Sequence, residues 1–300
     1  MNQQFLTELK AVTAENRIFT DEPMKKHTTF RVGGPADILV QPKGTELAAV
    51  IRLCRKYDVP YQVIGNGSNL LVGDRGIRGL VIEMLSKEDE ICVEDDCITV
   101  GAGMLLSKTA NRAAEHGLTG MEFAAGIPGS IGGAVVMNAG AYGGEMKDIL
   151  TAVTVLDQEG NEKILSAEEL ELGYRTSCIL KKGYIVTGAK IKLKHGEETA
   201  IRARMEELKK QRVEKQPLEY PSAGSTFKRP EGYFAGKLIE DAGLKGYRVG
   251  DVMVSDKHCG FVVNVGEGTY DEARQVIEHV QKTVEEKFHV SLELEVKMIQ

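Results

Sequence analysis

The sequence predicts an α+β protein made of more than one domain. Residues 1–85 read as strand, helix, strand, loop and strand, which is the order of an α/β unit. Residues 86–195 change to short strands joined by turns, a pattern that indicates hairpins. The 300 residues are enough for two or three compact domains at about 150 residues each.

Composition and charge are those of an ordinary globular protein. Hydrophobic residues make up 42% and charged residues 27%, and the net charge of −6 argues against nucleic acid as a partner. No basic segment followed by an apolar one opens the sequence, and no apolar run approaches the ~18 residues of a membrane span. The five cysteines form no C-x-x-C pair, and the histidines form no ligand cluster. We therefore expect a cytoplasmic protein with no metal site and no membrane partner.

The first 85 residues predict two helices and three strands. The first helix has its apolar side at Phe5, Leu6 and Leu9. Thr45 is the predicted N-cap of the second helix, whose apolar positions recur at helical spacing at Leu47, Val50, Ile51 and Cys54. Runs of apolar residues predict strands at 38–40, 61–64 and 80–82.

Residues 86–195 predict mainly strands. A hairpin is expected from 91–93 and 98–100, and a helix over 105–116 ends at Gly117. Further strands are expected at 153–156, 163–165 and 185–194. Ser166 and Glu169 form a predicted capping box that opens one short helical turn, which Gly173 ends.

The remaining residues return to helices. A helix from Glu197 is expected to stop before Pro217, with an apolar side that also includes a cation, at Ile201, Met205, Leu208 and Arg212. A polar loop at 220–230 precedes a short helix at 237–242 and strands at 252–254 and 261–263. Thr269 and Glu272 are expected to cap a long helix, and residues 290–298 alternate strictly, as in a strand.

Two glycine-rich loops are the strongest indication of function. Residues 121–145 contain seven glycines and no Lys or Arg, and residues 65–69 read Gly-Asn-Gly-Ser-Asn directly after a predicted strand. Successive N–H groups in such loops can bind an anion such as phosphate, although a plain turn is the alternative. The loop at 65–69 fails the dinucleotide fingerprint because Leu70 stands where the third Gly is required. The loops therefore predict phosphate binding without a classical nicotinamide fold.

Six motifs together resemble the UDP-N-acetylenolpyruvoylglucosamine reductase family, a group of flavin enzymes of peptidoglycan precursor synthesis. They occur in the family's order and span nearly the whole chain, at residues 28–34, 65–69, 125–133, 174–175, 223–228 and 294–296. The strand at 183–194 leaves no room for an inserted loop, so the chain resembles the family's shorter type, which lacks a tyrosine-bearing loop over the substrate.

The resemblance implies a vanillyl-alcohol-oxidase-type FAD-binding fold of two subdomains plus a third, substrate-binding α+β domain. The expected boundaries are 1–85 with 290–300 for the first subdomain, 86–196 for the second and 197–289 for the third. It also implies FAD as cofactor, with NADPH as hydride donor. The implied FAD-binding residues lie in the two glycine-rich loops, at Gly65, Asn66, Gly67, Ser68, Asn69, Ala125, Gly126, Ile127, Pro128, Gly129, Ser130 and Gly132.

The resemblance further implies the reaction and its residues. FAD N5 gives a hydride to the vinyl carbon of UDP-N-acetylglucosamine enolpyruvate, and the product is UDP-N-acetylmuramate. Arg175 would grip the substrate carboxylate, Glu295 would orient Arg175 and stabilise the enol, and Ser225 would donate the proton. The implied substrate contacts are Tyr174, Lys215 and Arg229, of which Arg229 replaces the Asn of the longer type. The expected setting is the cytoplasm of a bacterium, with the chain as a monomer.

The residues taken alone leave other interpretations open. Arg175 could form a surface salt bridge, Glu295 could lie on the wet face of an edge strand, and Ser225 could cap the turn at Gly224. An oxidase of the same FAD fold, acting on an alcohol or sugar, is the nearest alternative enzyme. A non-catalytic nucleotide-binding protein is the alternative of a different class.

Overall fold

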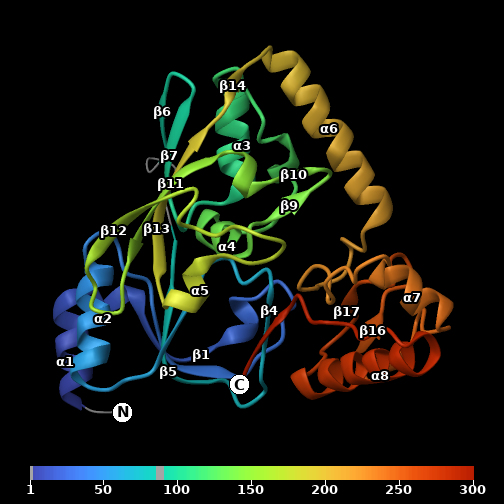
Figure 1. Ribbon diagram of the computed structural model, residues 1–300. Helices are drawn as coiled ribbons and strands as arrows, with labels where there is room; N and C mark the ends of the chain where they lie inside the picture. The colour runs from blue at the N-terminus through green and yellow to red at the C-terminus, as the bar shows by residue number, and fades with distance from the viewer. Residues whose placement is uncertain (1–2, 86–90) are drawn as a thin grey trace. The chain divides into compact units, whose positions relative to one another are not determined.

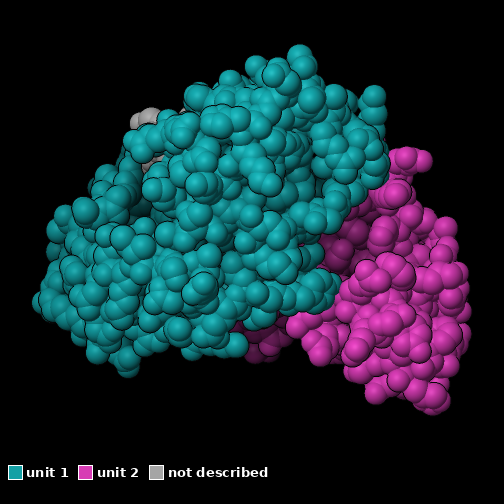
Figure 2. All heavy atoms as spheres, turned by 45° about the horizontal axis from the view of Figure 1, so that its top comes forward, with its two compact units in different colours: residues 1–20, 38–66, 79–212 teal, residues 21–37, 67–78, 213–300 magenta. Residues whose placement is uncertain are grey.

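The computed structural model describes residues 3–85 and 91–300, which group into two compact units (Figures 1 and 2). Unit 1 comprises residues 1–20, 38–66 and 79–212, and unit 2 comprises residues 21–37, 67–78 and 213–300. The chain therefore passes from one unit to the other several times, within β1, β2 and β5 among other places. The predicted division into two FAD subdomains and a substrate domain stays a prediction.

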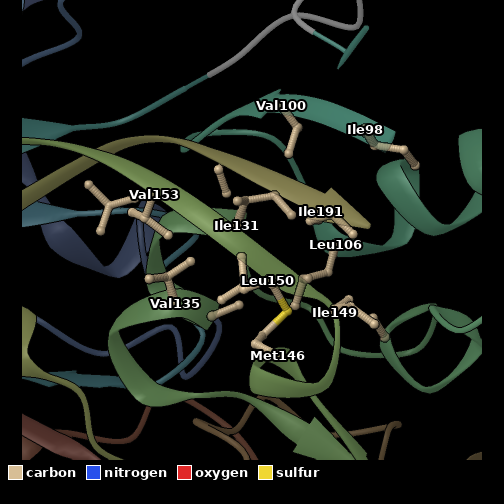
Figure 3. Close-up of a cluster of buried hydrophobic side chains, with 14 of the residues drawn as sticks. Ile98, Val100, Leu106, Ile131, Val135, Met146, Ile149, Leu150, Val153 and Ile191 are labelled. Carbon is tan, nitrogen blue, oxygen red and sulfur yellow. The ribbon is translucent and has the colours of Figure 1, made fainter. Parts of the chain in front are cut away.

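Unit 1 contains a five-stranded antiparallel sheet in the order β12-β11-β13-β7-β6. These strands are β6 (Ile91–Glu94), β7 (Cys97–Gly101), β11 (Leu150–Leu156), β12 (Glu162–Ser166) and β13 (Ile185–Lys192). Helices α3 (Leu106–Glu115) and α4 (Ile131–Met137) belong to the same core, in which Val100, Leu106, Ile131, Val153 and Ile191 lie close together (Figure 3).

A second core of unit 1 lies around helices α1 (Gln3–Val12) and α2 (Glu46–Lys56), which pack side by side (Figure 1). Their predicted apolar residues Phe5, Leu9, Val50 and Ile51 are fully buried. The adjoining sheet has the order β1-β2-β5-β3, and β3 and β5 are parallel. Its strands are β1 (Ile18–Pro23), β2 (Pro35–Val40), β3 (Tyr61–Ile64) and β5 (Ile77–Glu83).

The other elements of unit 1 are short, apart from one long helix. Helix α6 (Glu198–Lys215) ends before Pro217 as predicted, and its last three residues belong to unit 2. Helix α5, which the sequence pattern did not predict, spans Cys178–Lys182. Short strands are β8 (Leu118–Thr119), β9 (Gly140–Ala141), β10 (Gly144–Glu145) and β14 (Lys194–His195), and 3-10 turns are η1 (Glu15–Arg17), η4 (Glu122–Ala124) and η5 (Met146–Asp148).

Unit 2 packs two helices against a three-stranded antiparallel sheet in the order β15-β16-β17. Thr269 and Glu272 form the predicted capping box of α8, and Val276, Val280 and Val284 of this helix are fully buried. Strands β4 and β18 form a separate parallel pair. The elements are η2 (Met24–Lys26), β4 (Leu70–Val72), α7 (Ala235–Asp241), β15 (Arg248–Val249), β16 (Val252–Val254), β17 (Val262–Asn264), α8 (Tyr270–Phe288) and β18 (Lys297–Ile299).

Thr45 is at the N-cap position of α2, as predicted, but its side chain does not cap the helix. Thr45 already has helical angles, φ −69° and ψ −14°, and its side chain makes no capping hydrogen bond. The Glu46 carboxylate accepts from the Lys43 N–H at 2.9 Å, just before the helix, and from Arg17 at 2.7 Å. The capping box at Ser166 and Glu169 does form, at 2.8 and 3.3 Å, but it closes a turn and no α-helix follows.

The continuous strand predicted for 290–298 is wrong, since only β18 at its end is a strand with a regular partner. The preceding backbone changes partner at each step: Glu293 O accepts from Lys228 N at 2.8 Å and Glu295 N donates to Thr226 O at 2.9 Å. Lys297 N then donates to Asn69 O at 2.9 Å. Leu292 and Val296 are nevertheless buried while Ser291, Glu293 and Lys297 are exposed, so the predicted alternation survives as a burial pattern.

Candidate active site

The two glycine-rich loops meet in unit 1. The side-chain amide of Asn66, two residues after β3, donates to the Pro128 carbonyl at 2.6 Å. A Cβ on Gly65 would collide with the hydroxyl of Ser130, which is 2% exposed. The loops at 65–69 and 125–133, which are far apart in the sequence, are therefore in direct contact. Gly65 has no room for a larger side chain at this contact.

The second loop leads into a helix that the sequence pattern did not predict, because four glycines in this stretch disfavour one. Helix α4 begins directly after Ser130, its N-cap. Its start is fixed by backbone bonds from Ile131 N to Met104 O at 2.8 Å and from Gly132 N to Ala102 O at 2.7 Å. A Cβ on Gly132 would lie 3.1 Å from that of Ala102, so this glycine allows the helix to approach the strand closely. Gly132 thus has a packing role that needs no ligand.

The rest of the first loop lies in unit 2 and connects to Glu295. Gly67 has φ 60°, and a Cβ there would overlap the His27 carbonyl oxygen. Asn69 donates through its side-chain amide to the Glu295 carbonyl at 3.0 Å. The predicted FAD loop therefore ends by holding the backbone of a predicted catalytic residue.

Ser225 and Glu295 are brought together within unit 2. Glu295 N donates to the carbonyl of Thr226, which directly follows Ser225. Phe227 and Leu294 form an isolated antiparallel bridge next to it. These bonds use the backbone of both segments, and both residues are half-buried.

Arg175 and Tyr174 occupy the tip of a tight turn in unit 1. Gly173 and Thr176 exchange backbone hydrogen bonds at 3.1 and 3.3 Å, and Arg175 between them has φ 53°. The guanidinium donates to the carbonyls of Gly140 at 3.2 Å and Asn138 at 3.5 Å, and it lies 5.1 Å from the centre of the Tyr174 ring. The turn predicted to project these two side chains is therefore present.

Lys215 and Arg229, the other predicted substrate contacts, are exposed cations of unit 2. Lys215 is the last residue of α6. The Arg229 guanidinium lies 3.9 Å from the centre of the Phe234 ring and donates to the Tyr233 carbonyl at 3.3 Å. Tyr233 and Phe234 are themselves 48% and 61% exposed, so a cation and two aromatic rings share one surface.

Arg212 is a cation at the second glycine-rich loop that the sequence analysis did not assign to the site. A Cβ on Gly126 would lie 3.1 Å from the Arg212 side chain, and burial lowers the pKa of this guanidinium below its usual range. Within residues 3–85 and 91–300, no hydrogen bond or ion pair holds Arg212. One indication of this role was present in the sequence, because Arg212 lies on the otherwise apolar side of α6.

The residues present fit an FAD molecule. Two glycine-rich loops meet, and a guanidinium without a carboxylate partner in the described chain lies beside one of them. An anionic ligand such as the diphosphate of FAD would compensate that charge.

A cavity of about 560 Å³ in unit 2 is distinct from these residues. The motif at residues 28–34 contributes Thr28 and Arg31 to its wall, together with Lys25, Lys26, Tyr220 and Asn264. None of the predicted catalytic residues lines it.

In residues 3–85 and 91–300, no group of three or more His, Cys, Asp or Glu residues could hold a metal ion. No helix in those residues combines the length and the hydropathy of a membrane span. All five cysteines are unpaired, and burial raises the pKa of the Cys54 thiol to about 12.

Two family models match the sequence. A model described as FAD binding domain matches residues 36–166, and the model of the UDP-N-acetylenolpyruvoylglucosamine reductase C-terminal domain matches residues 216–299. The first match covers both the Gly65–Asn69 segment and the loop at 125–133, and the second covers Ser225 and Glu295.

Curated relatives and solved structures agree with these matches. A UDP-N-acetylenolpyruvoylglucosamine reductase of Agathobacter rectalis is 55% identical over 100% of this chain and 99% of its own length, and one from Clostridium perfringens is 53% identical with the same coverage. The crystal structure of this reductase from Thermus caldophilus is 41% identical, with a TM-score of 0.80 over 93% of this chain and 97% of that one. Alkyldihydroxyacetonephosphate synthase shares part of the fold, with 16% identity and a TM-score of 0.50 over 65% of this chain and 41% of its own.

Proposed function

The chain belongs to the UDP-N-acetylenolpyruvoylglucosamine reductase family and has its FAD-binding domain, and from that premise we propose its electron donor, its reaction and its catalytic residues. The donor is NADPH. The reaction reduces UDP-N-acetylglucosamine enolpyruvate to UDP-N-acetylmuramate. The catalytic residues are Arg175, Ser225 and Glu295.

The observation that carries the residue assignment is the backbone bond between the segments of Ser225 and Glu295. Glu295 N donates to Thr226 O at 2.9 Å, and Asn69 of the glycine-rich loop donates to Glu295 O at 3.0 Å. Both backbone groups of Glu295 are thus fixed. A site built this way supports preorganised side chains on rigid backbone.

Bound FAD would supply the hydride that the terminal vinyl carbon accepts. The electron pair of the double bond then moves to the neighbouring carbon and its carboxylate, which gains charge. Arg175 holds that carboxylate, because a guanidinium is planar, always charged and able to donate two parallel hydrogen bonds. Its turn and its two carbonyl contacts orient it for this task.

Ser225 and Glu295 complete the reaction. Glu295 stabilises, through its carboxyl group, the enolate that hydride addition leaves on the substrate. Ser225 donates its hydroxyl proton to the carbon next to the carboxylate, so that one hydride and one proton reduce the double bond. A serine is a weak acid, but the enolate that it protonates is a strong base.

The remaining predicted contacts serve the sugar nucleotide. Lys215 and Arg229 bind the diphosphate as cations, and Tyr174 contacts the substrate next to Arg175. The enzyme acts as a monomer in the bacterial cytoplasm, where it supports peptidoglycan synthesis and hence cell shape and division.

The visible spectrum of the purified protein tests the cofactor and the donor together. We expect flavin bands that anaerobic NADPH bleaches faster than NADH does, and that return when the enolpyruvyl sugar nucleotide is added. Bands that return only with O₂ would instead indicate an oxidase of the same fold. A protein that stays colourless when FAD is offered would contradict the assignment.

Replacing Ser225 by Ala tests the proton donor. The flavin should still be bleached by NADPH, while turnover falls by about 10² to 10⁴-fold because the general acid is lost. Ser222→Ala in the same loop is the matched control, since Ser222 takes part through its backbone carbonyl, which accepts from the Thr29 hydroxyl at 2.6 Å. Full turnover in Ser225→Ala would remove Ser225 from the mechanism.

A further inference from the structure

We propose that Asn138 is a positioning residue that sets the place and direction of the Arg175 guanidinium. This inference rests on the proposed role of Arg175 as the cation that holds the substrate carboxylate. Asn138 is the C-cap of α4, it has φ 42° in the left-handed region, and it is fully buried.

The side chain of Asn138 uses all of its hydrogen-bonding groups. Its amide donates to the Gly173 carbonyl at 3.0 Å and to the Glu145 carboxylate at 2.8 Å. Its oxygen accepts from Lys147 N at 2.9 Å. A buried amide that is satisfied in this way defines one arrangement of the segments around it, because any shift leaves a polar group unpaired.

One of those segments is the turn that carries Arg175. Gly173 begins this turn, and its carbonyl also accepts from Thr176 N at 3.3 Å. The bond from Asn138 therefore fixes the base of the turn against the end of α4. Arg175, two residues later, has φ 53°, so its direction depends on how the turn is held.

The backbone of Asn138 contacts the guanidinium itself. Arg175 Nη1 donates to the Asn138 carbonyl at 3.5 Å, and Nη2 donates to Gly140 O at 3.2 Å. These carbonyls belong to the chain leaving the C-terminal end of α4, where the helix dipole favours a cation. These two carbonyl contacts hold the guanidinium in one orientation.

Asn138 thus acts at both ends of the Arg175 side chain. Its side-chain amide fixes the turn that carries Arg175, and its backbone carbonyl contacts the guanidinium. Two-point recognition of a carboxylate depends on the orientation of the guanidinium, and an error of about 1 Å in a catalytic group can cost about 10²-fold in rate. Removing the Asn138 amide should therefore slow flavin reoxidation by the enolpyruvyl substrate, which uses the contact to the carboxylate. Flavin reduction by NADPH, which does not use that contact, should be unaffected.

Asn138→Gly isolates the amide, because glycine adopts the left-handed conformation freely and leaves the helix end unstrained. His289→Gly is the matched control: His289 is also a left-handed C-cap, with φ 55°, and it ends α8 in unit 2. The FAD-loaded proteins are studied in separate half-reactions, flavin reduction by NADPH and flavin reoxidation by the enolpyruvyl substrate, together with thermal unfolding.

We expect Asn138→Gly to slow reoxidation by about 10 to 100-fold, with unchanged reduction by NADPH. In an Arg175→Met background the same change should have no further effect on reoxidation, because the group that Asn138 positions is gone. His289→Gly should leave both half-reactions unchanged.

Two outcomes separate this inference from the function on which it rests. If Arg175→Met collapses reoxidation while Asn138→Gly does not, or if the two changes are additive, the positioning role is wrong and the role of Arg175 stands. If Arg175→Met leaves reoxidation intact, the proposed role of Arg175 itself is overturned. Equal slowing of both half-reactions by Asn138→Gly would show a general structural defect and would also overturn the positioning role.

Discussion

The glycine-rich loops and the segments of Ser225 and Glu295 are built in opposite ways. In the loops, Gly65, Gly67 and Gly132 have neighbours where a Cβ would be, so the residue type itself is set by close packing. Around Ser225 and Glu295, backbone hydrogen bonds join the two segments, from Glu295 N to Thr226 O and from Lys228 N to Glu293 O, and the Lys228–Glu293 ion pair adds to them. We therefore expect substitutions in the loops to act on stability and FAD binding, and substitutions of the proposed catalytic pair to act mainly on turnover.

The largest expected effect is that of Gly67→Ala. Its backbone is left-handed and a Cβ would overlap the His27 carbonyl, so the free energy of unfolding should fall by about 2 to 5 kcal/mol. Urea unfolding measures this. Gly44→Ala is the control with φ 50° and open space around the Cβ, and it should cost only about 1 kcal/mol. Equal losses in the two variants would mean that close packing does not determine Gly67.

Glu295→Gln should show the opposite behaviour. The backbone bonds of residue 295 remain, and turnover should fall by about 10²-fold because the proposed catalytic carboxylate is lost. Glu293→Gln is a control two residues away: its carboxylate, 75% exposed, pairs with Lys228 at 2.9 Å. Steady-state kinetics should find that variant unchanged. A similar loss in both would indicate a general electrostatic effect.

Arg212→Met should separate FAD binding from stability. The guanidinium lies against Gly126 and burial lowers its pKa, so its removal should leave the apoprotein equally or more stable. The dissociation constant of FAD should rise by about tenfold, as expected for a lost charged hydrogen bond. Fluorescence titration measures this, with Arg202→Met, an exposed partner of Glu198 on the same helix, as the control. Unchanged FAD affinity would remove Arg212 from the cofactor site.

Asn69→Ala tests the point where the two regions join. It removes the bond to Glu295 O and should cost about 1 kcal/mol of stability. Because Asn69 ends the FAD loop and holds Glu295, both FAD affinity and turnover at saturating FAD should fall a few-fold. Asn66→Ala, which loses only the bond to Pro128 O, should affect FAD affinity alone. If the two variants behave alike, the loop and the catalytic segment are not coupled.

The smallest effect is expected away from both regions, at the turn between β11 and β12. The N–H of Asn161, at 2.9 Å, and the Lys163 ammonium lower the pKa of Asp157 from 3.8 to about 2. A depressed pKa means that the charged carboxylate stabilises the fold above about pH 4 and that this contribution is lost as the pH falls towards 2. The difference in unfolding free energy between the wild type and Asp157→Asn should therefore shrink from pH 5 to pH 2. A constant difference would contradict the lowered pKa.

Much of the secondary structure could be predicted from local patterns. The apolar spacing of α2 and α8, the capping box at Thr269 and the hairpin of β6 and β7 all follow from side-chain periodicity and turn chemistry. Helix α4 was missed because its glycines have low helix propensity, and packing against β7 outweighs that preference. The prediction of a continuous strand at 290–298 was wrong because this backbone bonds to three different partners in succession. An alternating pattern of side chains does not show which backbone a strand will pair with.

The sequence by itself determined the α+β class, the two glycine-rich loops and the motifs that carry Arg175, Ser225 and Glu295. These are local properties, encoded in residue type and short-range spacing. Only the tertiary structure decided that the two loops touch, that Asn69 holds the Glu295 backbone, that Asn138 holds the turn of Arg175, and that Arg212 lies beside Gly126. Those relations join residues far apart in the chain, and they exist only after long-range packing has brought their backbones together.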